Sequence, residues 1–202
     1  MAKVLTQVES SPVLLRMQPV FEMTGENFFE FCQLNSELRI ERTAMGDVLI
    51  MPPTGGETSD RNAEITRQLR NWARQDGTGV AFDSSVGFNL PNGATRSPDA
   101  SWVERSRLEN LTLEQKRKFL PLCPDFVIEL RSPSDRLADV KGKMQEYVDN
   151  GAQLGWLLDP SNRQVYRYRP GLIEPLDNPQ EISDPLLPGF VLNLREIWEP
   201  GF

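Results

Sequence analysis

The run DFVIELR at 125–131 constrains the fold of this chain more than any other segment. Its continuous apolar centre is typical of a strand that is buried on both faces. Such a strand needs covering layers, and helical periodicity predicts helices at about 59–75 and 135–150. Further strands are predicted at 154–158 and 165–168. Strands that alternate with helices indicate an α/β (α+β) layered fold with a mixed sheet.

The 202 residues are enough for one well-filled domain. Residues 1–20 contain two prolines and no sustained period, so we expect a flexible N-terminal arm followed by a single domain over 21–202. Thr24 is a plausible N-cap for a short helix. Alternating runs in 38–51 predict a hairpin. After Pro170 the spacing of the prolines favours an extended wrap, and FVLNL at 190–194 is a candidate for a last edge strand.

Several kinds of chemistry are excluded by composition. The chain has no histidine, which removes the Ser-His-Asp triad, a histidine general base and histidine-ligated zinc. Cys32 and Cys123 are too few for a cysteine-rich metal site and are expected to be small buried groups. No glycine-rich phosphate loop is present. No segment has the ~18 apolar residues of a membrane span or the pattern of a signal peptide, so we expect a cytoplasmic protein without a membrane partner.

The net charge of −7 has the wrong sign for a protein that coats nucleic acid. A nucleic-acid function therefore requires a local basic strip, or divalent cations bound where carboxylates cluster.

Two carboxylates stand out by position. Glu129 lies at the end of the buried strand, where a carboxylate costs several kcal/mol unless it is paired or bound to a metal. The structural alternative is an ion pair between Glu129 and Arg131. Asp99 follows Pro98 at the predicted start of another strand, where ordinary turn chemistry is the alternative.

The helix after Glu129 offers two lysines, Lys141 and Lys143, on opposite sides of its apolar stripe. Either side chain could reach a site over the sheet, or either could be solvated, and periodicity does not choose between them. Two carboxylates and a lysine are a minimal set for hydrolysing a phosphodiester with Mg²⁺ or Mn²⁺.

Three runs share a recognisable spacing: RSPDASWV at 96–103, CPDFVIELRSPSDRL at 123–137 and KMQEYVDNGAQLGWLLDP at 143–160. Together with MPPTGGETSDRNAEI and LPGFVL, they resemble the Uma-two family over about residues 20–198. That family is catalogued as a domain of unknown function and is placed in the PD-(D/E)XK nuclease superfamily. The resemblance implies a restriction-endonuclease-like core, a mixed central sheet flanked by helices.

The resemblance also implies roles for single residues. Asp99 corresponds to the aspartate of the PD motif and Glu129 to the acid of the second motif, so both would be catalytic and bind the metal. The usual lysine two residues after that acid is replaced by Arg131, which leaves phosphate contact or holding Glu129 as its role. Lys143 matches a lysine that has moved to the following helix, with Tyr147 one turn on as a support.

An acid from the first long helix often joins such sites, and Glu64 is the matching candidate. Helical geometry places Glu64 ~120° from the apolar stripe, whereas Asn62 lies nearer to it. Both remain candidates.

These features predict a Mg²⁺- or Mn²⁺-dependent endonuclease that acts on DNA. We expect a homodimer, with the apolar Ile197-Trp198 packing across a two-fold axis. One rival is a catalytically inactive protein of the same fold that acts as a binding or regulatory module. Another is a glycoside hydrolase with no lysine between its carboxyl groups and with Trp102 and Trp156 lining a sugar groove, although core packing explains these tryptophans more simply.

Overall fold

The buried run forms strand β8 (Phe126–Leu130), in which all five residues are buried. It lies inside a six-stranded sheet with the order β11-β10-β9-β8-β7-β4. β8 and β9 are parallel, and α5 is the crossover between them, while the other neighbouring pairs are antiparallel. The predicted mixed sheet with covering helices is therefore confirmed.

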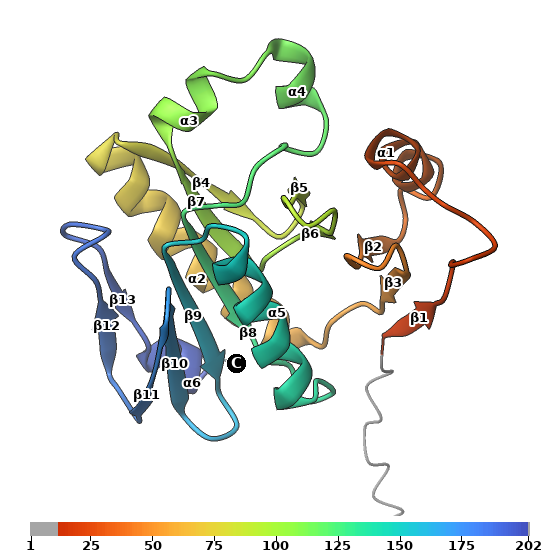
Figure 1. Cartoon of the computed structure of the whole chain (residues 1–202). Coiled ribbons are helices and arrows are strands. Elements are labelled where there is room, and N and C mark those ends of the chain that lie inside the picture. The colour runs from red at the N-terminus through yellow and green to blue at the C-terminus, as the bar shows by residue number, and fades with distance from the viewer. Residues whose placement is uncertain (1–11, 202) are drawn as a thin grey trace, which may run out of the picture.

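The computed structural model describes residues 12–201. The helices are α1 (Gly25–Leu34), α2 (Gly56–Asp76), α3 (Arg105–Glu109), α4 (Leu113–Arg117), α5 (Leu137–Asp149) and α6 (Arg195–Trp198). The strands are β1 (Val13–Leu15), β2 (Arg39–Arg42), β3 (Val48–Met51), β4 (Gly79–Asp83), β5 (Phe88–Asn89), β6 (Thr95–Arg96), β7 (Ala100–Glu104), β8, β9 (Leu154–Asp159), β10 (Gln164–Arg169), β11 (Leu172–Asp177), β12 (Glu181–Ser183) and β13 (Val191–Asn193). Figure 1 shows their arrangement.

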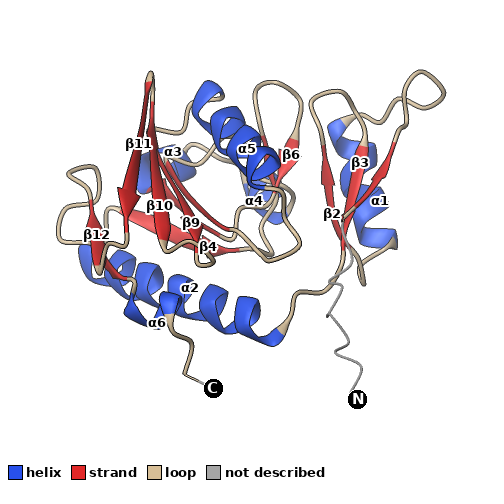
Figure 2. Cartoon of the chain, turned by 90° about the horizontal axis from the view of Figure 1, so that it is seen from below, coloured by secondary structure: helices blue, strands red, loops and turns tan. Residues whose placement is uncertain are grey.

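Helices α2 and α5 cover opposite faces of the large sheet (Figure 2). Strand alternation decides which residues meet which helix. Phe126, Ile128 and Leu130 belong to the same cluster as the α2 stripe. Val127, on the other face, packs in a cluster with residues of α5. Glu129 shares the Val127 face, so its carboxylate points toward α5.

Gly155 on β9 lets α5 approach the sheet closely. A Cβ at this position would lie 2.4 Å from the terminal methyl of Met144 and 3.3 Å from Val127. The missing side chain therefore lets the middle of α5 approach the sheet closely, beside Val127 of β8.

A second sheet, with the order β1-β3-β2-β6-β5, lies beside the large one (Figure 1). β6 is separated from β7 of the large sheet only by residues 97–99, so this short segment links the two sheets. The predicted hairpin is β2 and β3, and Thr24 caps α1 by accepting the N–H of Asn27.

The expected N-terminal arm is corrected in part. Residues 1–11 lie outside the described residues, but Val13–Leu15 form β1 and pair with β3. The wrap expected after Pro170 is also wrong, because β11 pairs with β10 along its whole length and β12 pairs with β13. The division of the chain at residue 20 stays a prediction.

The packing of Ile197 and Trp198 across a two-fold axis is contradicted as well. Both side chains are buried in the core of this chain, where α6 packs against α2. The apolar C-terminal segment therefore seals the α2 face of the sheet. Among the described residues, no helix is both long and apolar enough to cross a membrane.

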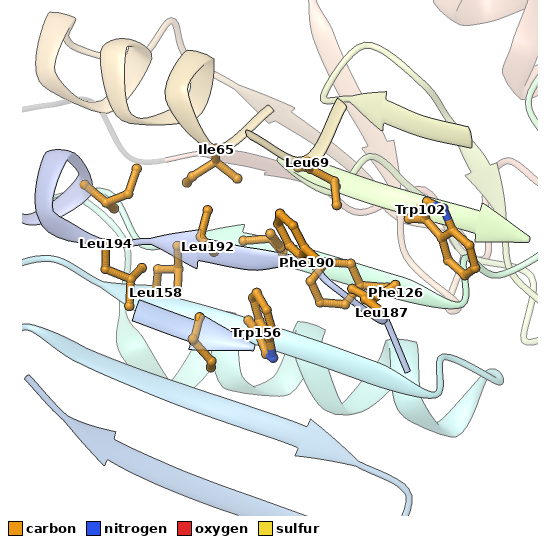
Figure 3. Close-up of a cluster of buried hydrophobic side chains, with 14 of the residues drawn as sticks. Ile65, Leu69, Trp102, Phe126, Trp156, Leu158, Leu187, Phe190, Leu192 and Leu194 are labelled. Atoms are coloured by element: carbon orange, nitrogen blue, oxygen red, sulfur yellow. The ribbon is translucent and has the colours of Figure 1, made fainter. Parts of the chain in front are cut away.

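A cluster of aromatic side chains lies in the core between α2 and the large sheet (Figure 3). Trp156 is fully buried and stacks on Phe190 at 5.8 Å between ring centroids. Phe126 meets the Trp156 ring edge-on at 4.8 Å. Trp102 is buried in the same cluster, so both tryptophans are core residues, as their spacing suggested.

Replacing Trp156 with Ala is expected to lower the free energy of unfolding by about 3–5 kcal/mol, because it removes a large buried side chain and leaves a cavity. Trp156→Phe should cost far less. Within residues 12–201 the indole N–H of Trp156 has no hydrogen-bond partner, so Phe sacrifices no polar contact. Urea unfolding measures both changes, and a loss below about 1 kcal/mol for Ala would contradict this packing.

Candidate active site

Asp99 lies immediately before β7, and its side chain bonds to residues of both β8 and α2. One of its carboxylate oxygens, Oδ2, accepts the backbone N–H of Leu130 at 2.9 Å. The other, Oδ1, accepts the side-chain amide of Asn62 on α2 at 3.2 Å. Burial raises the pKa of Asp99 above its ordinary value, although the Leu130 N–H and nearby Lys143 oppose this. The carboxylate is therefore fixed in place at the end of β8.

Glu129 lies one residue before Leu130, on the face of β8 that meets α5. It is 6% exposed, and its Oε1 accepts the hydroxyl of Tyr147 at 2.9 Å. The pKa of Glu129 is raised to about 7. Burial is the main cause, the Lys143 ammonium opposes it, and the negative charges of Asp99 and Glu41 add to the increase. This carboxyl group therefore changes charge close to neutral pH.

Lys143 is the lysine of α5 that reaches Glu129. Its Nζ lies 2.9 Å from Glu129 Oε1 and also 2.9 Å from Glu41 Oε1. Burial alone would lower the pKa of Lys143, but the two carboxylates raise it above its ordinary value. Lys141 instead places its Nζ 3.9 Å from the centre of the Tyr166 ring. The structure thus places Lys143, and not Lys141, beside Glu129, a choice that helical periodicity left open.

Glu41, on β2 of the second sheet, was not among the residues expected here. It is 1% exposed, and besides Lys143 it accepts bonds from Arg96 at 3.1 Å and from the Ser97 N–H at 2.9 Å. Burial alone would raise the pKa of Glu41, but Lys143 and Arg96 hold it below its ordinary value. Arg96 also pairs with Glu146 at 2.6 Å, which extends the network along α5.

Arg131 does not hold Glu129, so that structural alternative is wrong. Its guanidinium lies 3.1 Å and 3.0 Å from the two carboxylate oxygens of the fully buried Asp159, and its Nε donates to the Asp135 carbonyl. β8 ends at Leu130, so strand alternation no longer directs the next side chain. The arginine secures the end of β9.

Glu64 is not brought to Asp99 and Glu129 either. Its carboxylate binds Arg67 at 2.6 Å and 2.5 Å and accepts the side-chain amide of Gln68 at 2.8 Å. Arg67 lowers the pKa of Glu64. Together with Glu196, it lines a separate, smaller hollow. From α2 it is Asn62 that contacts Asp99.

A cavity of about 800 Å³ joins these side chains. Its walls come from β2 and β3 of the second sheet, the start of α2, the segment before β7, the end of β8, and α5. The polar residues at its centre are Glu41, Asn62, Arg96, Asp99, Glu129 and Lys143.

The oxygen atoms of this cavity suit a hard divalent cation. The carboxylates of Asp99 and Glu129 line it together, and the Asn62 carbonyl oxygen is buried with no hydrogen-bond partner among the described residues. Carboxylate and amide oxygens are the ligands that Mg²⁺ and Mn²⁺ prefer. Residues 12–201 contain no group of three His, Cys, Asp or Glu side chains placed to hold a metal. Asp99, Glu129 and Asn62 are the lining residues that we test below as ligands.

The cysteines lie outside this cavity. Burial raises the pKa of Cys123 to about 12 and that of Cys32 to about 11. Both thiols therefore stay protonated near neutral pH.

The chain is thus an α/β protein with a mixed sheet covered by helices and a polar cavity lined by both sheets, α2 and α5. One similar solved structure, from Anabaena variabilis, is described as "a putative nuclease belonging to DUF820". It matches with a TM-score of 0.71 and 22% sequence identity, over 87% of this chain and 97% of that chain. A family model described as "Uma2: Putative restriction endonuclease" matches residues 26–195, and the chain belongs to that family. No curated protein matches the chain.

Proposed function

We propose that the chain is an endonuclease that hydrolyses phosphodiester bonds in DNA with the help of Mg²⁺ or Mn²⁺. The observation that carries this proposal is the position of the Lys143 ammonium, 2.9 Å from Glu129 in the cavity that Asp99 also lines. The family description and the nuclease named in the similar structure support it.

Charge supports the need for a metal ion. The cavity wall contains six acidic and four basic side chains, so without a bound cation it would repel a phosphate. Asp99 and Glu129 would hold the ion, with the Asn62 carbonyl oxygen as a neutral ligand. When bound, such an ion polarises the phosphate and lowers the pKa of the attacking water.

The residues of the chain would perform the remaining steps. The Lys143 ammonium, which lies beside Glu129, would stabilise the negative charge that develops on the phosphate during attack. Tyr147, through its hydroxyl, fixes the orientation of Glu129. Arg39 and Arg136 also line the cavity and are candidates for contacts with flanking phosphates.

The glycoside hydrolase alternative fits the site poorly. It requires an acid pair with no lysine between them, whereas Lys143 bridges Glu41 and Glu129. Trp102 and Trp156, which would have lined a sugar groove, are buried in the core.

A duplex substrate and a cytoplasmic location belong to this proposal. Cutting both strands of a duplex is simplest with two active sites, so we expect a homodimer. Because Ile197 and Trp198 are buried within the chain, the proposed dimer interface must use another surface.

The direct test is cleavage of supercoiled plasmid and of single-stranded DNA by the purified protein. We expect nicked or linear products with Mg²⁺ or Mn²⁺ and none with EDTA. Equal cleavage by wild type and Asp99→Ala would remove the assignment. Metal binding without cleavage of either substrate would instead favour the non-catalytic binding module.

Metal binding should depend on pH through Glu129. Its pKa is raised to about 7, so below that pH a proton competes with the ion for the carboxylate. We expect Mn²⁺ affinity, measured by calorimetry, to be about tenfold weaker at pH 6 than at pH 8 and to level off above pH 8. Glu129→Gln should bind Mn²⁺ weakly and without this dependence. Equal affinity of the wild type at both pH values would contradict the role of Glu129.

A further inference from the structure

Among residues 12–201, Glu41 is the only acidic side chain lining the cavity that comes from the second sheet. Burying a carboxylate is costly unless charged or N–H donors compensate for the lost water. Glu41 has three such donors: the Lys143 ammonium, the Arg96 guanidinium and the Ser97 N–H. Lys143 comes from α5, whereas Arg96 and Ser97 are consecutive residues at the end of β6.

Two of these donors tie Glu41 to the proposed catalytic groups. Ser97 lies two residues before Asp99, so its bond to Glu41 Oε1 fixes the backbone that leads into the PD motif. Lys143 bonds to the same oxygen, Oε1. One atom of Glu41 thus sets the position of the lysine relative to the segment that carries Asp99.

The lysine side chain needs this second contact. With Glu129 alone, the ammonium at the end of a flexible four-carbon chain would have one anchor, which is also a proposed ligand of the metal. Glu41 provides an anchor outside the proposed set of metal ligands. Lys143 can therefore keep its place when Glu129 binds an ion.

A purely structural ion pair in this protein looks different. Asp159 is equally buried, and both of its oxygens bind the guanidinium of Arg131. It contacts neither Lys143 nor the segment before Asp99. This pair provides a control, a buried carboxylate on a strand whose cation, Arg131, contacts the cavity residue Asp135 but whose own oxygens bond to none of Lys143, Glu129 and Asp99.

We propose that Glu41 is a positioning residue that holds the Lys143 ammonium and the backbone before Asp99 in one fixed arrangement, which makes the second sheet part of the active site. This inference rests on the proposed nuclease function for its effect on turnover. Its effect on Lys143 itself can be measured in the metal-free protein.

The first measurement is therefore independent of catalysis. The chain has five lysines, so the ¹⁵N spectrum of its side-chain ammonium groups is sparse. An ammonium held by two buried carboxylates exchanges slowly with water, and Lys143→Met identifies its signal by removing it. We expect Glu41→Gln to broaden or abolish that signal and Asp159→Asn to leave it sharp. An unchanged signal in Glu41→Gln would overturn the proposal.

The second measurement uses steady-state cleavage. Misplacing a catalytic group by about 1 Å can cost about 100-fold in rate. We therefore expect Glu41→Gln to lower kcat by about 100-fold with little change in KM, and Asp159→Asn to leave kcat within about twofold. In a Lys143→Met background, adding Glu41→Gln should cost no more than about twofold, because the glutamine oxygen can still accept the Ser97 N–H and the contact with Lys143 is already gone.

Alternative outcomes remain distinguishable. A full additional loss from Glu41→Gln in the Lys143→Met background would assign Glu41 a structural role and overturn the proposal. If Glu41→Gln does not fold, Glu41→Asp keeps the charge but withdraws the carboxylate by one methylene, and a sharp ammonium signal with wild-type kcat would also overturn it. Absent cleavage in the wild type would end the nuclease proposal alone, since the ammonium spectrum still tests Glu41.

Discussion

Lys143→Met is expected to lower kcat for DNA cleavage by about 10²–10⁴-fold. Methionine keeps most of the length and the apolar contacts of the lysine but removes the ammonium. Without this ammonium beside Glu129, no lysine stabilises the negative charge that develops on the phosphate during attack. Cleavage of plasmid under saturating Mn²⁺, with rates measured from initial product formation, tests this expectation.

The same substitution should also lower stability. It leaves Glu129 and Glu41 without their shared cation in a buried site, and breaking a buried pair in this way costs about 3–5 kcal/mol. Rates must therefore be compared below the melting temperature of the variant. Lys141→Met is the matched control, because Lys141 lies on the same helix but rests on the Tyr166 ring. Equal losses of activity in the two variants would contradict the assignment of Lys143.

Asp99→Asn is expected to abolish metal binding and cleavage without destabilising the fold. Asparagine has nearly the same shape and can still accept the Leu130 N–H. It lacks the negative charge that attracts the ion, so we expect at least ~100-fold weaker Mn²⁺ binding and ~10³-fold slower cleavage. Calorimetry and plasmid cleavage measure the two effects separately.

Unlike Lys143→Met, Asp99→Asn should not lower the stability of the protein. Burial raises the pKa of Asp99, so the ionised group makes folding less favourable as pH rises through that pKa. At pH 8 the neutral amide avoids this cost, and the melting temperature should stay the same or rise. Glu64→Gln is the control for metal binding, because Glu64 is paired with Arg67 away from the cavity. Retained cleavage in Asp99→Asn, or loss of Mn²⁺ binding in Glu64→Gln, would contradict the site.

The sequence predicted the core of this fold well, because its central features are local. The uninterrupted apolar run of β8 and the stripes of α2 and α5 depend only on short-range periodicity. The strand β11 was missed because the spacing of the prolines after Pro170, beginning with Pro175 inside β11, favoured an extended wrap.

The site was harder to predict because its contacts are long-range. Glu41 reads as an ordinary charged residue in an alternating strand, and its partners Arg96 and Lys143 lie 55 and 102 residues further along the chain. Helical spacing placed Asn62 nearer than Glu64 to the apolar stripe, but the choice between them also depended on the position of Asp99, which helical spacing does not give. Arg131 does not contact Glu129, because β8 ends at Leu130 and strand alternation does not extend to residue 131. The ion pair suggested by their spacing therefore does not form.

The most direct measurement is a crystal structure of the protein with Mn²⁺, in which anomalous scattering locates the ion. We expect one strong peak in the cavity at about 2.1 Å from carboxylate oxygens of Asp99 and Glu129, with the Lys143 ammonium facing it and still bonded to Glu41. A cavity without a peak at saturating Mn²⁺, or an ion bound at Glu64 and Glu196 instead, would contradict the account.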